Sequence, residues 1–230
     1  MNPRFTQAAL SLAFLLPSMA AEPARTPPGA EAEGDYPFAE VIRRTTGQEV
    51  IAFDAANPAH AALLEKLKTA AAAAAESARK AKIVSARANE VGNAIEAHVF
   101  QALNAAGLTA QRPRTATGRG QAAGYPDVAI ESDPPCYLEL KTYNARTANS
   151  TQHTFYYSPA TETKVTRAAL HLLLAYEFEQ QTDGGQTIWV PVHFKLVSLH
   201  DLTVQLKVEY NQSNRGLYAP EKLLADEPVK

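Results

Sequence analysis

The chain has 230 residues, a formal net charge of −2, 46% hydrophobic residues and 20% charged residues. This composition is typical of a globular protein with one sizeable core, and it disfavours a protein that binds nucleic acid through overall positive charge. The single cysteine, Cys136, excludes an intrachain disulfide, and neither cysteine nor histidine spacing indicates a zinc site.

The first 35 residues predict a leader and a linker. Residues 1–20 contain Arg4, a short apolar run and the small-residue sequence Ser18-Met19-Ala20, which together resemble a cleavable secretory signal. Residues 21–35 are rich in Pro, Ala, Gly and Glu and predict a disordered linker. The signal would place the protein in the periplasm or outside the cell, whereas a mis-assigned start codon would leave it in the cytoplasm.

Residues 36–88 are expected to form an N-terminal helical extension. The stretch 58–88 is rich in strong helix formers and contains six consecutive alanines at 70–75. Because it has few bulky apolar side chains, we expect this helix to pack thinly or to bridge through solvent.

A second helix is predicted over residues 89–106. Ile95, Val99 and Leu103 recur every four residues and form an apolar stripe that would cover a sheet. Gly107 follows as the expected C-terminal cap.

The segment GYPDVAIESDPPCYLELKTYN, residues 124–144, predicts a β-hairpin. Two apolar runs, 128–130 and 137–143, read as strands, and the Ser-Asp-Pro-Pro sequence at 132–135 reads as the turn between them. A loop of this length lies within the usual hairpin range.

The hairpin predicts two different faces, because side chains alternate along a strand. Leu138 and Leu140 would point into the core. Glu139 and Lys141 would point the other way, and Asp127 would lie opposite Glu139. Two carboxylates and an ammonium would therefore meet on one face.

This charged face has two interpretations. Neighbouring carboxylates repel each other unless a cation lies between them, and Mg²⁺ binds one or two protein carboxylates together with water and phosphate oxygens. The alternative is the solvated face of an amphipathic hairpin, on which Glu139 and Lys141 have no chemical role.

The remaining sequence predicts one more helix and two strands. Residues 162–180 are expected to be helical because their apolar residues keep a 3.6-residue rhythm, and 187–197 and 202–210 are expected to be strands, with Pro191 at an edge or a bulge. The order of helix, helix, hairpin, helix, strand, strand predicts an α/β fold, a mixed central β-sheet flanked by helices. The core would span residues 89–225.

Basic residues flank the hairpin on both sides: Arg112, Arg114 and Arg119 precede it, and Arg146, Lys164 and Arg167 follow it. They would form a local basic groove for nucleic acid or be scattered solvated charges, and the sequence leaves both interpretations open.

Pro126-Asp127, eleven intervening residues and Glu139-Leu140-Lys141 resemble the PD-(D/E)xK nuclease superfamily, which includes most type II restriction endonucleases. The stretch Gly92-Asn93-Ala94-Ile95-Glu96, with the apolar helix behind it, resembles the G-x-x-x-E element of many members. Glu96 matches the acid of that element, and Glu90 is a second candidate on a different side of the helix.

The resemblance implies a restriction-endonuclease-like fold and a metal-dependent DNA endonuclease. Asp127 and Glu139 would bind Mg²⁺, for which Mn²⁺ can substitute. Lys141 would orient the attacking water or help to deprotonate it, and Glu96 would complete the site. The products would carry 5′-phosphate and 3′-hydroxyl ends.

Several alternatives stay open at this stage. An exported nuclease or toxin is the second interpretation of the function, and a non-catalytic exported binding module on the same fold is the third. DNA is the expected partner. A homodimer is one possible assembly, and no membrane association is expected after the leader is removed.

Overall fold

The computed structural model describes residues 35–85, 90–120, 124–144, 146, 157, 162–205, 219–225 and 228. The predicted signal peptide and residues 21–34 of the predicted linker lie outside the described residues. Asp35–Leu206 forms one compact unit. In the second unit, the described residues include a short 3-10 helix, η3 (Pro220–Lys222).

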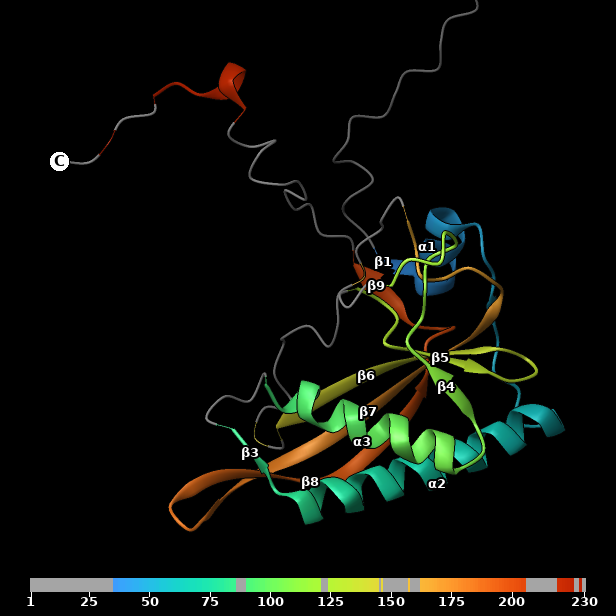
Figure 1. Cartoon of the computed structure of the whole chain (residues 1–230). Coiled ribbons are helices and arrows are strands. Elements are labelled where there is room, and N and C mark those ends of the chain that lie inside the picture. Colours follow the sequence, from blue (N-terminus) through green and yellow to red (C-terminus); the bar gives the residue numbers. More distant parts are fainter. Residues whose placement is uncertain are drawn as a thin grey trace, which may run out of the picture. The chain divides into compact units, whose positions relative to one another are not determined.

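A seven-stranded mixed sheet forms the centre of the main unit (Figure 1). The order across the sheet is β3 (Ile83–Val84), β8 (Gln186–Ser198), β7 (Ala169–Asp183), β6 (Cys136–Asn144), β5 (Val128–Glu131) and β4 (Thr109–Gln111), with β2 (Val50–Ile51) also paired to β7. The strands β6 and β7 are parallel, as are β2 and β7, and the other neighbours are antiparallel.

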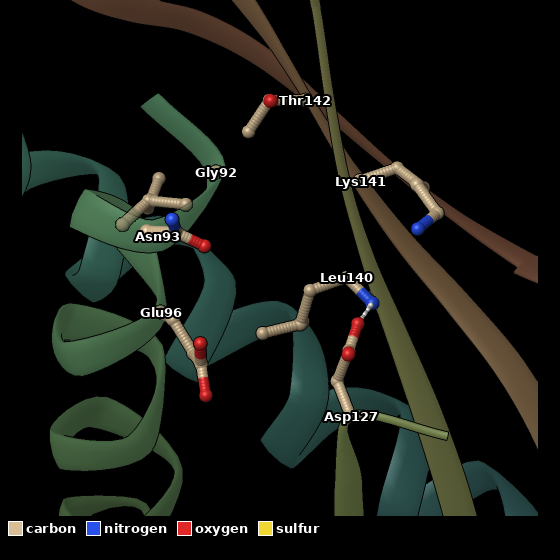
Figure 2. A pocket seen from close by; sticks show the side chains of 8 residues that line it. Gly92, Asn93, Glu96, Asp127, Leu140, Lys141 and Thr142 are labelled. Carbon is tan, nitrogen blue, oxygen red and sulfur yellow. Dashed lines mark hydrogen bonds between the residues drawn. The ribbon is translucent and has the colours of Figure 1, made fainter. Parts of the chain in front are cut away.

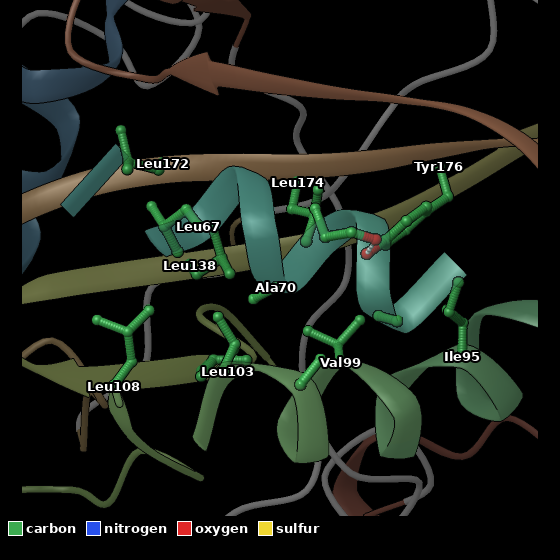
Figure 3. Packing of buried hydrophobic residues seen from close by; sticks show 14 of the residues in the cluster. Leu67, Ala70, Ile95, Val99, Leu103, Leu108, Leu138, Leu172, Leu174 and Tyr176 are labelled. Carbon is green, nitrogen blue, oxygen red and sulfur yellow. Dashed lines mark hydrogen bonds between the residues drawn. The ribbon is translucent and has the colours of Figure 1, made fainter. Parts of the chain in front are cut away.

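Helices cover both faces of this sheet, as the sequence predicted. On one face, α2 (Pro58–Ala81) and α3 (Val91–Ala105) pack against Leu138, Leu172 and Leu174 (Figure 3). On the other face, α1 (Phe38–Thr46) packs with Tyr125, Tyr137 and Ala169. A small two-stranded sheet of β1 (Asp35–Pro37) and β9 (Thr203–Gln205) adjoins α1, because Phe38 N–H donates to the Leu202 carbonyl.

The alanine-rich helix α2 is a core element, and the expectation of thin or solvent-bridged packing was wrong. Ala70, Ala71, Ala74 and Ala78 are all buried. Small side chains let a helix approach its neighbours closely, and Tyr176 Oη of β7 donates to the Ala71 carbonyl at 3.0 Å. Because these alanine side chains are small, α2 can lie close to β7.

The predicted helix at 162–180 was also wrong, because residues 169–183 form the strand β7. All residues from Ala169 to Tyr176 are buried. A central strand covered on both faces has a continuous apolar run without alternation, and periodicity alone does not distinguish such a run from a buried helix.

The predicted hairpin, the second predicted helix and the predicted strand 187–197 are close to those observed. Of the predicted strand 202–210, β9 forms Thr203–Gln205, and residues 206–210 lie outside the described residues. The hairpin pairs Val128 with Leu138, which is the predicted register. Strand β8 corresponds to the predicted strand 187–197, and the β7–β8 register shifts beside Pro191, where a bulge was expected. Helix α3 ends before Gly107, whose φ of 73° is left-handed. None of the described helices combines the length and hydrophobicity needed to cross a membrane.

Candidate active site

The candidate site lies where β5 and β6 separate. The last pair of the two strands is Val128 with Leu138, and from Glu139 to Asn144 β6 pairs with β7 on its other edge. Asp127, just before β5, covers the exposed edge: its Oδ2 accepts a hydrogen bond from Leu140 N–H at 2.8 Å (Figure 2). The hairpin geometry therefore fixes one carboxylate beside the middle of β6.

A pocket of about 250 Å³ opens between this edge of β6 and the first turns of α3. We call it the carboxylate pocket; it is lined by Gly92, Asn93, Ile95, Glu96, Asp127, Leu140, Lys141 and Thr142. Figure 2 shows Glu96 on α3 and Asp127 before β5 on either side of Leu140, with Lys141 leaving β6 in the opposite direction from Leu140. Two acids from separate elements thus line one pocket.

Glu139 is the most strongly perturbed carboxylate of the site. It is 4% exposed, and its Oε1 lies 2.7 Å from Lys141 Nζ. Its Oε2 is buried and accepts no hydrogen bond from the described residues. The pKa of Glu139 is raised to about 7, first by burial and then by the charge of Asp127, while Lys141 and Lys164 oppose the shift.

These two carboxylates suit a hard divalent cation. A desolvated carboxylate with an unused oxygen beside a second carboxylate would be stabilised by a positive charge between them. Among the described residues, no group of three or more His, Cys, Asp or Glu side chains could hold a metal ion. Two carboxylates offer the oxygen ligands that a hard cation such as Mg²⁺ takes together with several waters, whereas zinc sites use mainly nitrogen and sulfur ligands.

The two candidate acids at the start of α3 have different surroundings. Glu96 lines the carboxylate pocket, and its Oε1 lies 2.7 Å from Arg112 Nη2. Glu90 does not line the pocket, and its Oε2 accepts a hydrogen bond from Ser85 Oγ at 2.6 Å. The geometry thus places Glu96, and not Glu90, with Asp127.

Lys164 is a charged residue whose position the sequence analysis missed. It is 4% exposed, and its Nζ donates to the Gly124 carbonyl. Burial lowers its pKa, whereas the charges of Asp127 and Glu139 raise it, so the ammonium interacts electrostatically with both carboxylates. The predicted helix at 162–180 hid this position, which only the assignment of β7 as a strand would have indicated.

A buried polar pair supports the α1 face beneath the site. Tyr125 Oη and His171 Nδ1 lie 2.6 Å apart, and the two rings are stacked. Burial lowers the pKa of His171 to about 3, so the imidazole is neutral in the folded protein. Because Tyr125 follows Gly124, this pair also holds the backbone to which Lys164 is bonded.

Comparison with known proteins gives two matches. The model of the type II restriction enzyme MjaV family matches residues 32–221, a range that contains Glu96, Asp127, Glu139, Lys141 and Lys164. A type II restriction enzyme, MjaV of Methanocaldococcus jannaschii, is 31% identical over 210 residues, which cover 84% of this chain and 89% of that protein. Residues 1–20 fall outside the range that the family model matches.

Proposed function

The chain belongs to the type II restriction enzyme MjaV family, and from this we propose that it is a DNA endonuclease that depends on a divalent metal ion. The observation that carries the proposal is the pair of carboxylates at the open edge of β6. Asp127 is fixed there by Leu140 N–H, and Glu139 is buried with one oxygen unused. Carboxylates whose pKa is shifted by burial and by a second charge are concentrated at functional sites.

Asp127 and Glu139 would hold Mg²⁺, for which Mn²⁺ can substitute. When bound, such an ion polarises a phosphoryl group and lowers the pKa of a coordinated water. The protein contributes the fixed position of the two acids, because Asp127 is hydrogen bonded to the strand that carries Glu139.

Lys141 would act on the attacking water and on the charge that develops at phosphorus. Its Nζ lies 2.7 Å from Glu139 Oε1, beside the proposed metal ligand, and the residue also lines the carboxylate pocket. From there it can orient the water or stabilise the transition state. Glu96 would complete the site from α3, and in-line attack would leave a 5′-phosphate and a 3′-hydroxyl.

The residues that the structure describes form one such site, so cleavage of both strands of a duplex follows most simply from a homodimer. The size of the protein on DNA in solution tests this assembly. The signal at residues 1–20 remains a prediction, and export of a reporter fused to those residues tests it.

Metal-dependent DNA cleavage is the decisive test of the function. Asp127→Asn and Glu139→Gln should each abolish cleavage in Mg²⁺ and in Mn²⁺, because each removes one of the two charges that hold the ion. Glu90→Gln is the matched control, since Glu90 does not line the pocket, and it should cut at the wild-type rate.

Thermal melts of all four proteins show whether folding is preserved. An Asp127→Asn protein that cuts at the wild-type rate would overturn the site assignment. Wild-type protein that cuts no DNA in either metal would overturn the proposed function itself.

A further inference from the structure

A second pocket, of about 220 Å³, lies between the segment after β4 and the segment before β7. Four cations line it: Arg112, Arg114, Lys164 and Arg167. We call it the basic pocket. Glu131 is the one carboxylate among its lining residues. The local charge is therefore strongly positive in a chain whose net charge is −2.

The four cations are not equally neutralised. Arg167 donates to both oxygens of Glu131, at 2.7 and 2.5 Å, and Arg112 pairs with Glu96. Arg114 Nη1 instead donates to the Gly118 carbonyl at 3.1 Å, and Lys164 Nζ donates to the Gly124 carbonyl. Within the described part of the chain neither Arg114 nor Lys164 forms an ion pair. The charge of the exposed Arg114 is available to a ligand, whereas the charge of the buried Lys164 is partly balanced by Asp127 and Glu139.

The basic pocket and the carboxylate pocket adjoin each other. Arg112 lines the basic pocket and pairs with Glu96, which lines the carboxylate pocket. Lys164 lines the basic pocket and interacts electrostatically with Asp127 and Glu139. A chain of phosphates passing the carboxylates would therefore pass these cations as well.

On the basis of the proposed endonuclease function, we propose that the basic pocket binds a backbone phosphate of the DNA strand that is cut, next to the phosphate that is cleaved. Guanidinium and ammonium groups are the side chains that bind phosphate oxygens best. Phosphates along one strand follow each other at about 3.4 Å of helix axis, so a neighbour of the cleaved group is within reach of an adjoining pocket. Such a contact positions the strand without reading its sequence.

Arg114→Gln is the main test, because Arg114 is exposed and its substitution removes no side chain from the core. Binding of a short duplex is measured in Ca²⁺, without cleavage, as a function of salt. Loss of one phosphate contact should weaken binding roughly five- to tenfold at about 0.1 M salt and reduce the slope of log K against log salt by about 0.9. The loss should be equal for a duplex that the enzyme cuts and for a scrambled duplex.

Lys68→Gln is the control for net charge, because Lys68 lies on the exposed side of α2 and pairs with Glu65. It should leave affinity and salt slope unchanged. Lys164→Gln, checked for folding by thermal melting, should show the same loss of slope as Arg114→Gln.

The outcomes separate this proposal from the function on which it rests. If the wild type cuts DNA but Arg114→Gln keeps its affinity and slope, the phosphate subsite is wrong and the endonuclease stands. If inorganic phosphate binds in a way that Arg114→Gln abolishes while DNA binding is unaffected, the pocket holds a free anion and the DNA contact is wrong. Wild type that neither binds nor cuts DNA overturns both.

Discussion

The two faces of the central sheet differ sharply in chemistry, although the same strands supply both. The face under α2 and α3 is filled by aliphatic and alanine side chains together with Tyr176 and Trp189. The face under α1 includes Glu139, His171 and Lys164 among its buried residues. Strand β6 contributes Leu138 to the first face and Glu139 to the second, and both are almost fully buried.

This difference shows how one strand can serve stability and catalysis separately. Burying a charge costs free energy unless it is paired, and Glu139 has only one of its oxygens paired with Lys141. The aliphatic face supplies the stability that offsets this cost. Substitutions on the two faces should therefore separate loss of cleavage from loss of folding.

The largest loss of cleavage relative to loss of folding is expected for a substitution at Lys141. Lys141→Ala should lower single-turnover cleavage at saturating Mg²⁺ by about 10²–10⁴, the usual scale for one acid–base or electrostatic contact. Its ammonium pairs with the buried Glu139, so the substitution should also lower stability, and thermal melts check that the variant is folded at the temperature of the assay. DNA binding in Ca²⁺ should be retained, because the lysine acts on the water and on the developing charge.

Lys68→Ala removes a lysine far from the site and should cleave as the wild type does. A Lys141→Ala protein within about threefold of wild type would reduce this residue to a surface charge. The sequence Glu139-Leu140-Lys141 would then have no catalytic role, and substitutions on the α1 face would no longer affect cleavage more than substitutions on the other face.

At Leu138, on the face covered by α2 and α3, a substitution should instead lower the stability of the fold. Leu138→Ala should destabilise the protein by about 2–5 kcal/mol, as other truncations of buried leucines do. Leu140→Ala should cost less, because Leu140 is only partly buried against the same cluster. Urea unfolding measures both, with the exposed Leu224→Ala as a control. No loss for Leu138→Ala would contradict the assignment of this face to the core.

The hairpin and its register could be predicted because the charges fall on one face only. Glu139 and Lys141 alternate with Leu138 and Leu140, and this alternation fixes which side of the strand is buried. The pairing of Val128 with Leu138 followed from the turn between the strands. The local pattern therefore contained the information that positions Asp127 beside β6.

Strand β7 could not be predicted in the same way, because both of its faces are buried. Its apolar run has no alternation, and the rhythm that suggested a helix is accidental. The error also hid Lys164, whose burial depends on contacts with segments far away in the sequence. Likewise, the close packing of α2 depends on partners that the alanine run itself does not specify.

The smallest expected effect is on the pH dependence of stability. Two buried groups of the α1 face, Glu139 and His171, change the free energy of unfolding with pH in opposite directions. The pKa of Glu139 is raised from 4.5 to about 7, so the folded protein holds a proton that the unfolded chain has released. Its contribution to stability is therefore complete below pH 4.5 and is lost as the pH rises through 7. The pKa of His171 is lowered from 6.5 to about 3, so its contribution is complete above pH 6.5 and is lost on acidification.

Between pH 7 and about 5.5 each group changes the free energy of unfolding by roughly 1–2 kcal/mol, and the two changes nearly cancel in the wild type. Glu139→Gln removes one of them. On acidification without metal ions, this variant should therefore lose about 1–2 kcal/mol relative to wild type, as measured by urea unfolding in EDTA at both pH values. On the same acidification, the free energy of unfolding of His171→Gln should rise relative to that of wild type. Equal pH dependence of wild type and Glu139→Gln would mean that Glu139 is already ionised at low pH, and the α1 face would then not hold a desolvated carboxylate that awaits a cation.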